Sequence, residues 1–131
     1  MKRILIVEDE PELQELLCAY LQDAGYAAAV AGDGAAALDL FRAQSFDLVL
    51  LDIMLRGSSG FEVAEFVRSN RLDCKIIILT AYHEFDFASK ALSMDLQDYL
   101  LKPVRPSVLL QRVRDVLHLS SPARAATGLA V

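Results

Sequence analysis

The sequence lacks the features of a membrane, secreted or disulfide-rich protein. No apolar run among its 131 residues approaches the roughly 20 that a membrane helix needs. Only four apolar residues stand between Met1-Lys2-Arg3 and Glu8, too few for the core of a signal peptide. Cys18 and Cys74 show no CxxC or Cys/His spacing, so we interpret both as reduced thiols. We therefore predict a cytoplasmic protein with no membrane partner.

Basic clusters are also missing. The formal net charge is −5, and no run of lysine or arginine interrupts the chain. Binding to nucleic acid needs clustered positive charge to neutralise phosphates. We predict no direct nucleic-acid binding by these residues, although a longer parent chain could carry a separate DNA-binding module.

What is present is the composition of a globular domain, 54% hydrophobic and 24% charged. A chain of this length corresponds to one domain that can bury a sizeable core. We predict that the domain spans residues 1–119. Residues 120–131 lose hydrophobic periodicity, and we interpret them as a linker or a disordered tail.

Five short apolar runs alternate with segments of helical periodicity. The runs cover residues 4–7, 27–30, 48–51, 75–79 and 98–101. This alternation predicts an α/β fold, a doubly wound five-stranded parallel sheet with right-handed crossovers. The flavodoxin-like order 2-1-3-4-5 suits a chain of this size, although the pattern alone does not give the order. We expect the first and last helices on one face and the other three on the opposite face.

Residues suited to helix ends mark the predicted boundaries of the helices. Proline fits a first turn, glycine a C-terminus, and aspartate or serine an N-cap. These positions are Pro11 and Pro106 for first turns, Gly25 for a C-terminus, and Asp33 and Ser58 or Ser59 for N-caps. Residues 57–60 are predicted to be a loop, and residues 84–94 a helix.

Polar side chains follow four of the five predicted strands. Four consecutive aliphatic residues lead to Asp52, and Glu8-Asp9 follows the first strand. Thr80 and Lys102 end the fourth and fifth strands. Ligands of open α/β sheets gather beyond the carboxyl ends of the strands. With the first and third strands adjacent, we expect Glu8, Asp9 and Asp52 to share one cleft.

Three neighbouring carboxylates repel one another unless a cation is present. A site made only of oxygen ligands suits Mg²⁺, which prefers a few carboxylates, waters and a phosphate oxygen. One carboxylate could then attack a phosphoryl group, as aspartyl-phosphate enzymes do. The metal, Lys102 and the Thr80 hydroxyl would neutralise or bind the phosphoryl oxygens.

Other interpretations compete with this one. An aspartate at a strand end is often a solvated turn residue, and Glu10 is interpreted as a charge at a helix N-terminus. An Mg²⁺-dependent phosphatase or mutase would use the same nucleophile, but typically needs a second Asp where Met54 stands. A flavin-binding module would need a phosphate-binding loop where this chain has Glu8-Asp9-Glu10.

Four motifs in register resemble the receiver domain of two-component response regulators. They are Val7-Glu8-Asp9-Glu10, Leu51-Asp52-Ile53-Met54, Thr80-Ala81 and Asp98-Tyr99-Leu100-Leu101-Lys102-Pro103. The resemblance covers roughly residues 1–118. It implies that Asp52 is the phosphoacceptor, charged by the phosphohistidine of a sensor histidine kinase.

The resemblance also implies a metal site. Asp9, Asp52 and the backbone carbonyl of Met54 would hold Mg²⁺, with Glu8 acting through water. Mn²⁺ is expected to substitute for Mg²⁺. The chain would promote its own phosphoryl transfer and slow dephosphorylation, and would not be an enzyme with turnover on a separate substrate.

The family's switch has counterparts here. Thr80 and Lys102 would contact the phosphoryl group, and the Lys102-Pro103 peptide bond is expected to be cis. Tyr99 would turn inward behind Thr80, although a tyrosine in a strand is as often simple core packing. A local change of charge would thereby bias a two-state packing element.

The resemblance implies an output surface formed by the fourth helix, the fifth strand and the fifth helix. Phe85, Phe87 and Tyr99 mark it as a candidate face for homodimerisation or output docking. Residues 80–85 look most like receivers attached to AraC-type DNA-binding domains. Arg56 and Asp95 depart from the family pattern, which often has Pro and Gly there.

Overall fold

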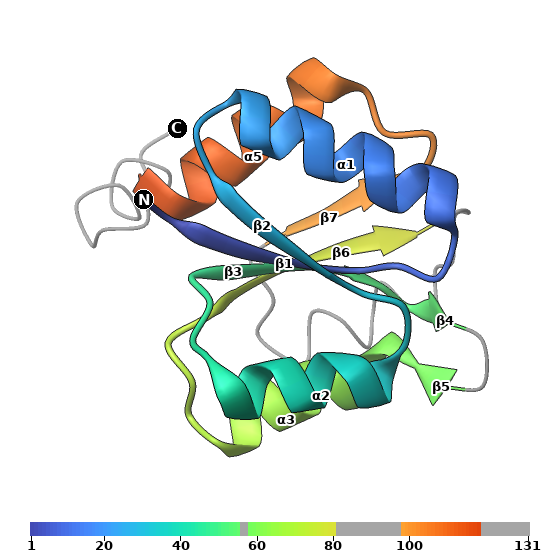
Figure 1. The fold of residues 1–131 in the computed structure, drawn as a ribbon, viewed down its shortest axis with the longest axis vertical. Coiled ribbons are helices and arrows are strands. Elements are labelled where there is room, and N and C mark those ends of the chain that lie inside the picture. Colours follow the sequence, from blue (N-terminus) through green and yellow to red (C-terminus); the bar gives the residue numbers. More distant parts are fainter. Residues whose placement is uncertain (56–57, 81–97, 119–131) are drawn as a thin grey trace, which may run out of the picture.

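The computed structural model describes residues 1–55, 58–80 and 98–118 of the chain. Its centre is a five-stranded parallel sheet in the order β2-β1-β3-β6-β7 (Figure 1). The strands are β1 (Arg3–Val7), β2 (Ala27–Ala31), β3 (Leu48–Asp52), β6 (Lys75–Thr80) and β7 (Asp98–Leu101). In chain order this is 2-1-3-4-5, so the predicted fold class and strand order are confirmed.

The central strands are the continuous aliphatic runs of the sequence. Ile4 to Val7 in β1 and Leu48 to Leu51 in β3 are 0% exposed, as expected for strands covered on both faces. The two strands pair in register, with Val7 opposite Leu51. The alanine-rich β2 lies at one edge, where all its side chains except that of Ala31 are only partly buried.

Successive residues of the central strands point to opposite faces and build two cores. Helices α1 (Pro11–Asp23) and α5 (Pro106–His118) cover the face that presents Ile6 and Leu50. Helices α2 (Gly34–Ala43) and α3 (Gly60–Ser69) cover the other face, which presents Leu5 and Val49 (Figure 1). The predicted placement of these four helices is confirmed, and the helix predicted over residues 84–94 lies outside the described residues.

Most of the predicted helix boundaries are confirmed. Pro11 and Pro106 are the first residues of α1 and α5. Asp33 caps α2, its carboxylate Oδ1 accepting a hydrogen bond from the Ala36 N–H at 2.8 Å. Gly25 follows the C-terminus of α1 with φ of 95°, the left-handed conformation that glycine adopts most easily.

The segment after β3 differs from the prediction of a loop over residues 57–60. Two short antiparallel strands, β4 (Met54–Leu55) and β5 (Ser58–Ser59), pair Met54 with Ser59. Helix α3 begins immediately after them, at Gly60. The Gly60 N–H donates to the Ile53 carbonyl at 3.2 Å, which brings the two ends of this segment together. Two-residue strands carry too little periodicity to be visible in the sequence.

None of the helices in the described ranges is long and apolar enough to span a bilayer. The predicted domain boundary at residue 119, the tail over residues 120–131, and Arg56 and Asp95 lie outside the described residues.

Candidate functional site

The predicted polar residues meet at the carboxyl end of the sheet, which we define as the edge where β1, β3, β6 and β7 end. The parallel pairing of β1 with β3 brings Glu8, one residue beyond Val7, beside Asp52. The pairing of β6 with β7 places Thr80 opposite Leu101, so that Lys102 follows directly. The Lys102 N–H also donates to the Thr80 carbonyl at 2.7 Å. Strand order and register alone therefore gather these residues.

These side chains are buried, which is unusual for polar groups. Within the described ranges, the buried polar or charged residues are Glu8, Asp52 and Thr80, with exposures of 0%, 3% and 5%. All three lie at the carboxyl end of the sheet. Burial of a carboxylate is costly unless a partner compensates its charge, so such clusters often mark functional sites.

Lys102 supplies the compensating charge. Its Nζ lies 2.7 Å from Glu8 Oε1 and 3.0 Å from Asp52 Oδ2. The lysine thus bridges the two buried carboxylates, which come from two different strands. The sequence placed Lys102 near Asp52, but gave no sign that it would also bind Glu8.

The pKa values of the bridge reflect this environment. Burial raises the pKa of Glu8, and repulsion by Asp52 adds to the rise, although the hydrogen bonds from Lys102 and from the Glu10 N–H oppose it. For Lys102, burial would lower the pKa, but the hydrogen bonds to Glu8 and Asp52 and the attraction of both carboxylates raise it overall. The ammonium group is therefore held charged between the two acids.

Backbone and helix groups fix Glu8 in place. The Glu10 N–H, at the start of α1, donates to Glu8 Oε2 at 3.1 Å. The Gln14 side-chain amide, one turn further along α1, donates to the Glu8 carbonyl. Sequence reasoning missed Gln14, because a glutamine on a helix gives no local sign that it faces a site.

The three acids can hold a metal ion. One carboxylate oxygen from each of Glu8, Asp9 and Asp52 lies within 4.8 Å of the others. Oxygen ligands of Mg²⁺ lie at about 2.1 Å, so ligands on opposite sides of the ion are about 4 Å apart. The donor set, all carboxylate and partly open to solvent at Asp9, fits this ion. Met54 lies two residues beyond Asp52, and the role of its carbonyl as a ligand stays a prediction.

The Lys102-Pro103 peptide bond is cis, as predicted. The side chain of Tyr99 lies outside the described residues, as do Phe85 and Phe87, so the predicted switch residue and output face are not tested at those positions. The backbone of Tyr99 lies in β7, opposite Ile78.

Comparisons with known proteins agree with this geometry. The chain is 40% identical over 113 residues to the DNA-binding response regulator MtrA of Mycolicibacterium smegmatis, covering 86% of this chain and 49% of that protein. It is 40% identical over 123 residues to the transcriptional regulatory protein DltR of Streptococcus agalactiae, covering 94% of this chain and 55% of that protein. The chain thus spans about half the length of these relatives.

These relatives correct one prediction. MtrA and DltR are named as a DNA-binding response regulator and a transcriptional regulatory protein, and an AraC-type output is not supported. That prediction depended on residues 80–85, and six residues are too short a segment to identify an output domain.

A solved structure and a family model complete the comparison. The response regulator TrrA of Thermotoga maritima, in complex with Mg²⁺-BeF, is 40% identical with a TM-score of 0.80, over 89% of this chain and 100% of that one. Residues 4–114 match the model of the response regulator receiver domain. The chain therefore belongs to the receiver-domain family of two-component response regulators.

Proposed function

We propose that Asp52 is the phosphoacceptor of this receiver domain and that a sensor histidine kinase is its donor. A carboxylate oxygen of Asp52 attacks the phosphorus of a phosphohistidine. The P–O bond forms as the P–N bond breaks, and the imidazole leaves with its electron pair. The observation that supports this assignment is the ion pair of Asp52 with Lys102 at 3.0 Å, in a site where Asp52 is 3% exposed.

The neighbouring residues have distinct roles in this proposal. The Lys102 ammonium and the Thr80 hydroxyl bind oxygens of the phosphoryl group while that group is transferred to Asp52. Asp9 and Asp52, the Met54 carbonyl and, through water, Glu8 would hold Mg²⁺, and the bound ion would neutralise charge on the transferred group. Mn²⁺, with the same preference for oxygen ligands, would substitute.

The same arrangement explains why we propose a switch and not an enzyme with turnover. A phosphatase or mutase of this chemistry would place a second acid two residues after the nucleophile, and the chain has Met54 there. The phosphoryl group therefore stays on Asp52 and leaves slowly. Thr80, and Tyr99 behind it, would pass the change to the output surface.

Intact-mass measurement tests the proposal. Incubation with acetyl phosphate and Mg²⁺ should add one phosphoryl group to the wild-type chain and none to Asp52→Asn. Asp47→Asn is the matched control, because Asp47 precedes the same strand at its other end and should leave uptake unchanged. No added mass in the wild type, or uptake by Asp52→Asn, would contradict the assignment.

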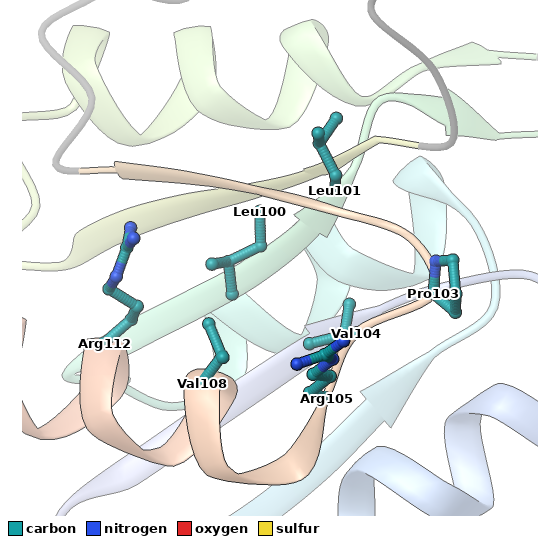
Figure 2. A pocket seen from close by; sticks show the side chains of 7 residues that line it. All are labelled: Leu100, Leu101, Pro103, Val104, Arg105, Val108 and Arg112. Carbon is teal, nitrogen blue, oxygen red and sulfur yellow. The ribbon is translucent and has the colours of Figure 1, made fainter.

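We further propose that a second copy of the chain docks on the surface made by β7, α5 and the fourth helix predicted over residues 84–94. A groove of about 500 Å³ lies between β7 and α5. Figure 2 shows Leu100 pointing from β7 toward Val108 on α5, with Arg112 one turn along the helix. Val108 is 37% exposed, so a matching face of a second copy would remove apolar surface from water.

The oligomeric state tests this surface. Analytical ultracentrifugation should show dimers of the wild-type chain in at least one of two conditions, with or without Mg²⁺ and beryllium fluoride. Val108→Asp should abolish these dimers. Leu16→Asp is the control, because Leu16 is also exposed but lies on α1. Dimers that survive Val108→Asp, or no dimers in any condition, would reject the surface.

The relatives support a role in the control of transcription. MtrA is named a DNA-binding response regulator, and DltR a transcriptional regulatory protein. We propose that the present chain is the receiver part of such a regulator. DNA would then be bound through a separate output domain, and the protein would act in the cytoplasm.

A further inference from the structure

Gly60 is the first residue of α3, and it lies directly against the backbone of the acidic site. Its N–H donates to the Ile53 carbonyl at 3.2 Å. Ile53 follows Asp52, and its own N–H donates to the Leu79 carbonyl of β6 at 3.4 Å. The start of α3 is thus tied to the peptide that follows the proposed phosphoacceptor.

The space at Gly60 does not admit a side chain. A Cβ atom there would lie 2.8 Å from Ile53 Cα and 3.0 Å from the Asp52 carbonyl carbon, and closer still to the Asp52 carbonyl oxygen. All three are backbone atoms of buried residues at the end of a central strand. They cannot move aside as a flexible side chain can, because β3 is paired on both sides.

Glycine is required here by space and not by backbone conformation. Gly25 has φ of 95°, which L-residues rarely adopt, whereas no such φ occurs at Gly60. Gly32 differs again, because a Cβ there would meet only Gln14 Nε2 at 3.7 Å, an ordinary contact. Among the glycines with a described environment, Gly60 is therefore the one whose missing side chain lets two backbone segments approach.

We infer that Gly60 is a positioning residue for phosphoryl transfer, a role that deepens the proposed function of Asp52 and depends on it. The close approach of α3 fixes the Asp52–Ile53 peptide. That peptide sets the direction of the Asp52 carboxylate toward Lys102, and the position of Met54 one residue further. A methyl group at Gly60 pushes this peptide away, and a misplacement of about 1 Å is enough to slow a reaction.

The test compares Gly60→Ala with Gly32→Ala. Both substitutions add one methyl group, but only the first adds it against Asp52. We expect Gly60→Ala to slow phosphorylation by acetyl phosphate by about 10- to 100-fold, since a misplacement of about 1 Å can cost 100-fold. Affinity for Mg²⁺, measured by NMR titration without a phosphoryl donor, should weaken by about 10-fold, as loss of a supporting group does. Gly32→Ala should match the wild type in both.

A stabilised background separates positioning from a merely structural role. Arg71→Gly, at the opposite end of α3, is expected to raise stability without touching the site. Rates are therefore also measured for Gly60→Ala combined with Arg71→Gly, per folded molecule. The slow rate and weak Mg²⁺ binding should persist in this more stable background and with added sucrose.

Three results would overturn the inference. The first is a phosphorylation rate of folded Gly60→Ala equal to that of the wild type. The second is recovery of this rate when Arg71→Gly is added. The third is failure of Gly60→Ala to fold in both backgrounds even with sucrose, which favours the folded state. The wild-type measurement distinguishes these from failure of the proposed function. If the wild-type chain takes up no phosphoryl group but binds Mg²⁺, the role of Asp52 is wrong, and the Mg²⁺ titration alone decides the role of Gly60.

Discussion

Two aspartates lie at the two ends of the same strand, and their surroundings differ. Asp47 precedes β3, is half-buried, and accepts a hydrogen bond from the Arg3 N–H at 2.7 Å. Asp52 ends β3, is 3% exposed, and is paired with Lys102 beside two other acids. Asp47 ties two strands together, whereas Asp52 is a buried charge that needs the compensating charge of Lys102. An aspartate's role is therefore set by what the topology brings to it.

The same contrast extends to the two ends of the sheet. At the amino end, where β3 and β6 begin, aromatic and apolar contacts dominate. Phe41 meets Phe46 edge to face with ring centroids 5.6 Å apart, and Cys74 is 3% exposed. At the carboxyl end, charged groups are buried together. We expect the loss of a carboxylate at the carboxyl end to change function more than stability, and the loss of Lys102, which compensates the remaining carboxylates, to cost stability as well. Substitutions of buried residues at the amino end should change stability and leave phosphorylation intact.

The largest expected effect is the loss of metal-dependent phosphorylation in Asp9→Asn. Removing one of three neighbouring carboxylates should relieve repulsion and leave the fold intact, but it removes a proposed ligand of Mg²⁺. Phosphorylation by acetyl phosphate should fall to the level seen with EDTA, while the thermal midpoint stays the same or rises. Asp73→Asn, an exposed acid at the amino end, should change neither. An unfolded Asp9→Asn chain would mean that Asp9 is structural.

Lys102→Met should destabilise the metal-free protein by about 3 kcal/mol, the usual cost of leaving a buried charge without its partner. The deficit should grow as pH rises. Glu8 has a raised pKa in the folded protein, so its uptake of a proton stabilises the variant at low pH, and this contribution is lost as pH rises through the folded pKa. Urea denaturation of the wild type and of Lys102→Met at several pH values measures this difference in the free energy of unfolding.

Lys75→Met, at the first residue of β6, is the matched control for that substitution. Lys75 is half-buried, and the described residues show no ion pair for its ammonium group, so this substitution should cost less than about 1 kcal/mol. Equal losses of stability in the two lysine variants would show that the buried carboxylates at the carboxyl end do not depend on Lys102 for charge compensation.

Cys74 should make the protein less stable at alkaline pH. Burial raises the pKa of this thiol to about 12. The thiol therefore stays protonated in the folded chain while it ionises in the unfolded chain, and its contribution to stability is lost between about pH 9 and pH 12. By pH 10 the loss relative to pH 7 should be about 1.4 kcal/mol. Cys74→Ala should flatten the pH dependence of the free energy of unfolding, and phosphorylation should persist in this variant.

The smallest effect is expected at Arg71, which follows α3 with φ of 53°. Gly25 occupies the corresponding place after α1 with φ of 95°. Arg71→Gly should therefore stabilise the chain by about 0.5 kcal/mol, whereas Gly25→Ala should destabilise it by about 1 kcal/mol. Thermal denaturation of both variants checks this, and a loss of stability in Arg71→Gly would contradict it.

The sequence predicts most of the fold because its strands are strongly patterned. Continuous aliphatic runs such as Ile4 to Val7 have no other plausible place than a buried strand, and Pro11 and Asp33 mark helix starts by local chemistry. The gathering of Glu8, Asp9, Asp52 and Lys102 follows once the strand order is assumed. The sequence therefore predicts which residues meet at the ends of neighbouring strands, but not the contacts between their side chains.

The rest depends on contacts that local sequence does not carry. The bridge from Lys102 to Glu8 joins residues far apart in the chain at 2.7 Å, and no pattern specifies that distance. Gly60 looks like any loop glycine until the backbone of Asp52 is seen beside it. The β4–β5 pair is too short to show periodicity. Packing between segments decides each of these features.

The central claim is that the carboxyl end of β3, and not another acid of the cluster, receives the phosphoryl group. The most direct test is borohydride reduction of the phosphorylated wild-type chain, which converts a phosphorylated aspartate to homoserine, followed by peptide mass spectrometry. We predict homoserine at position 52 alone. Homoserine at position 9, or at position 47 at the other end of the strand, would contradict it.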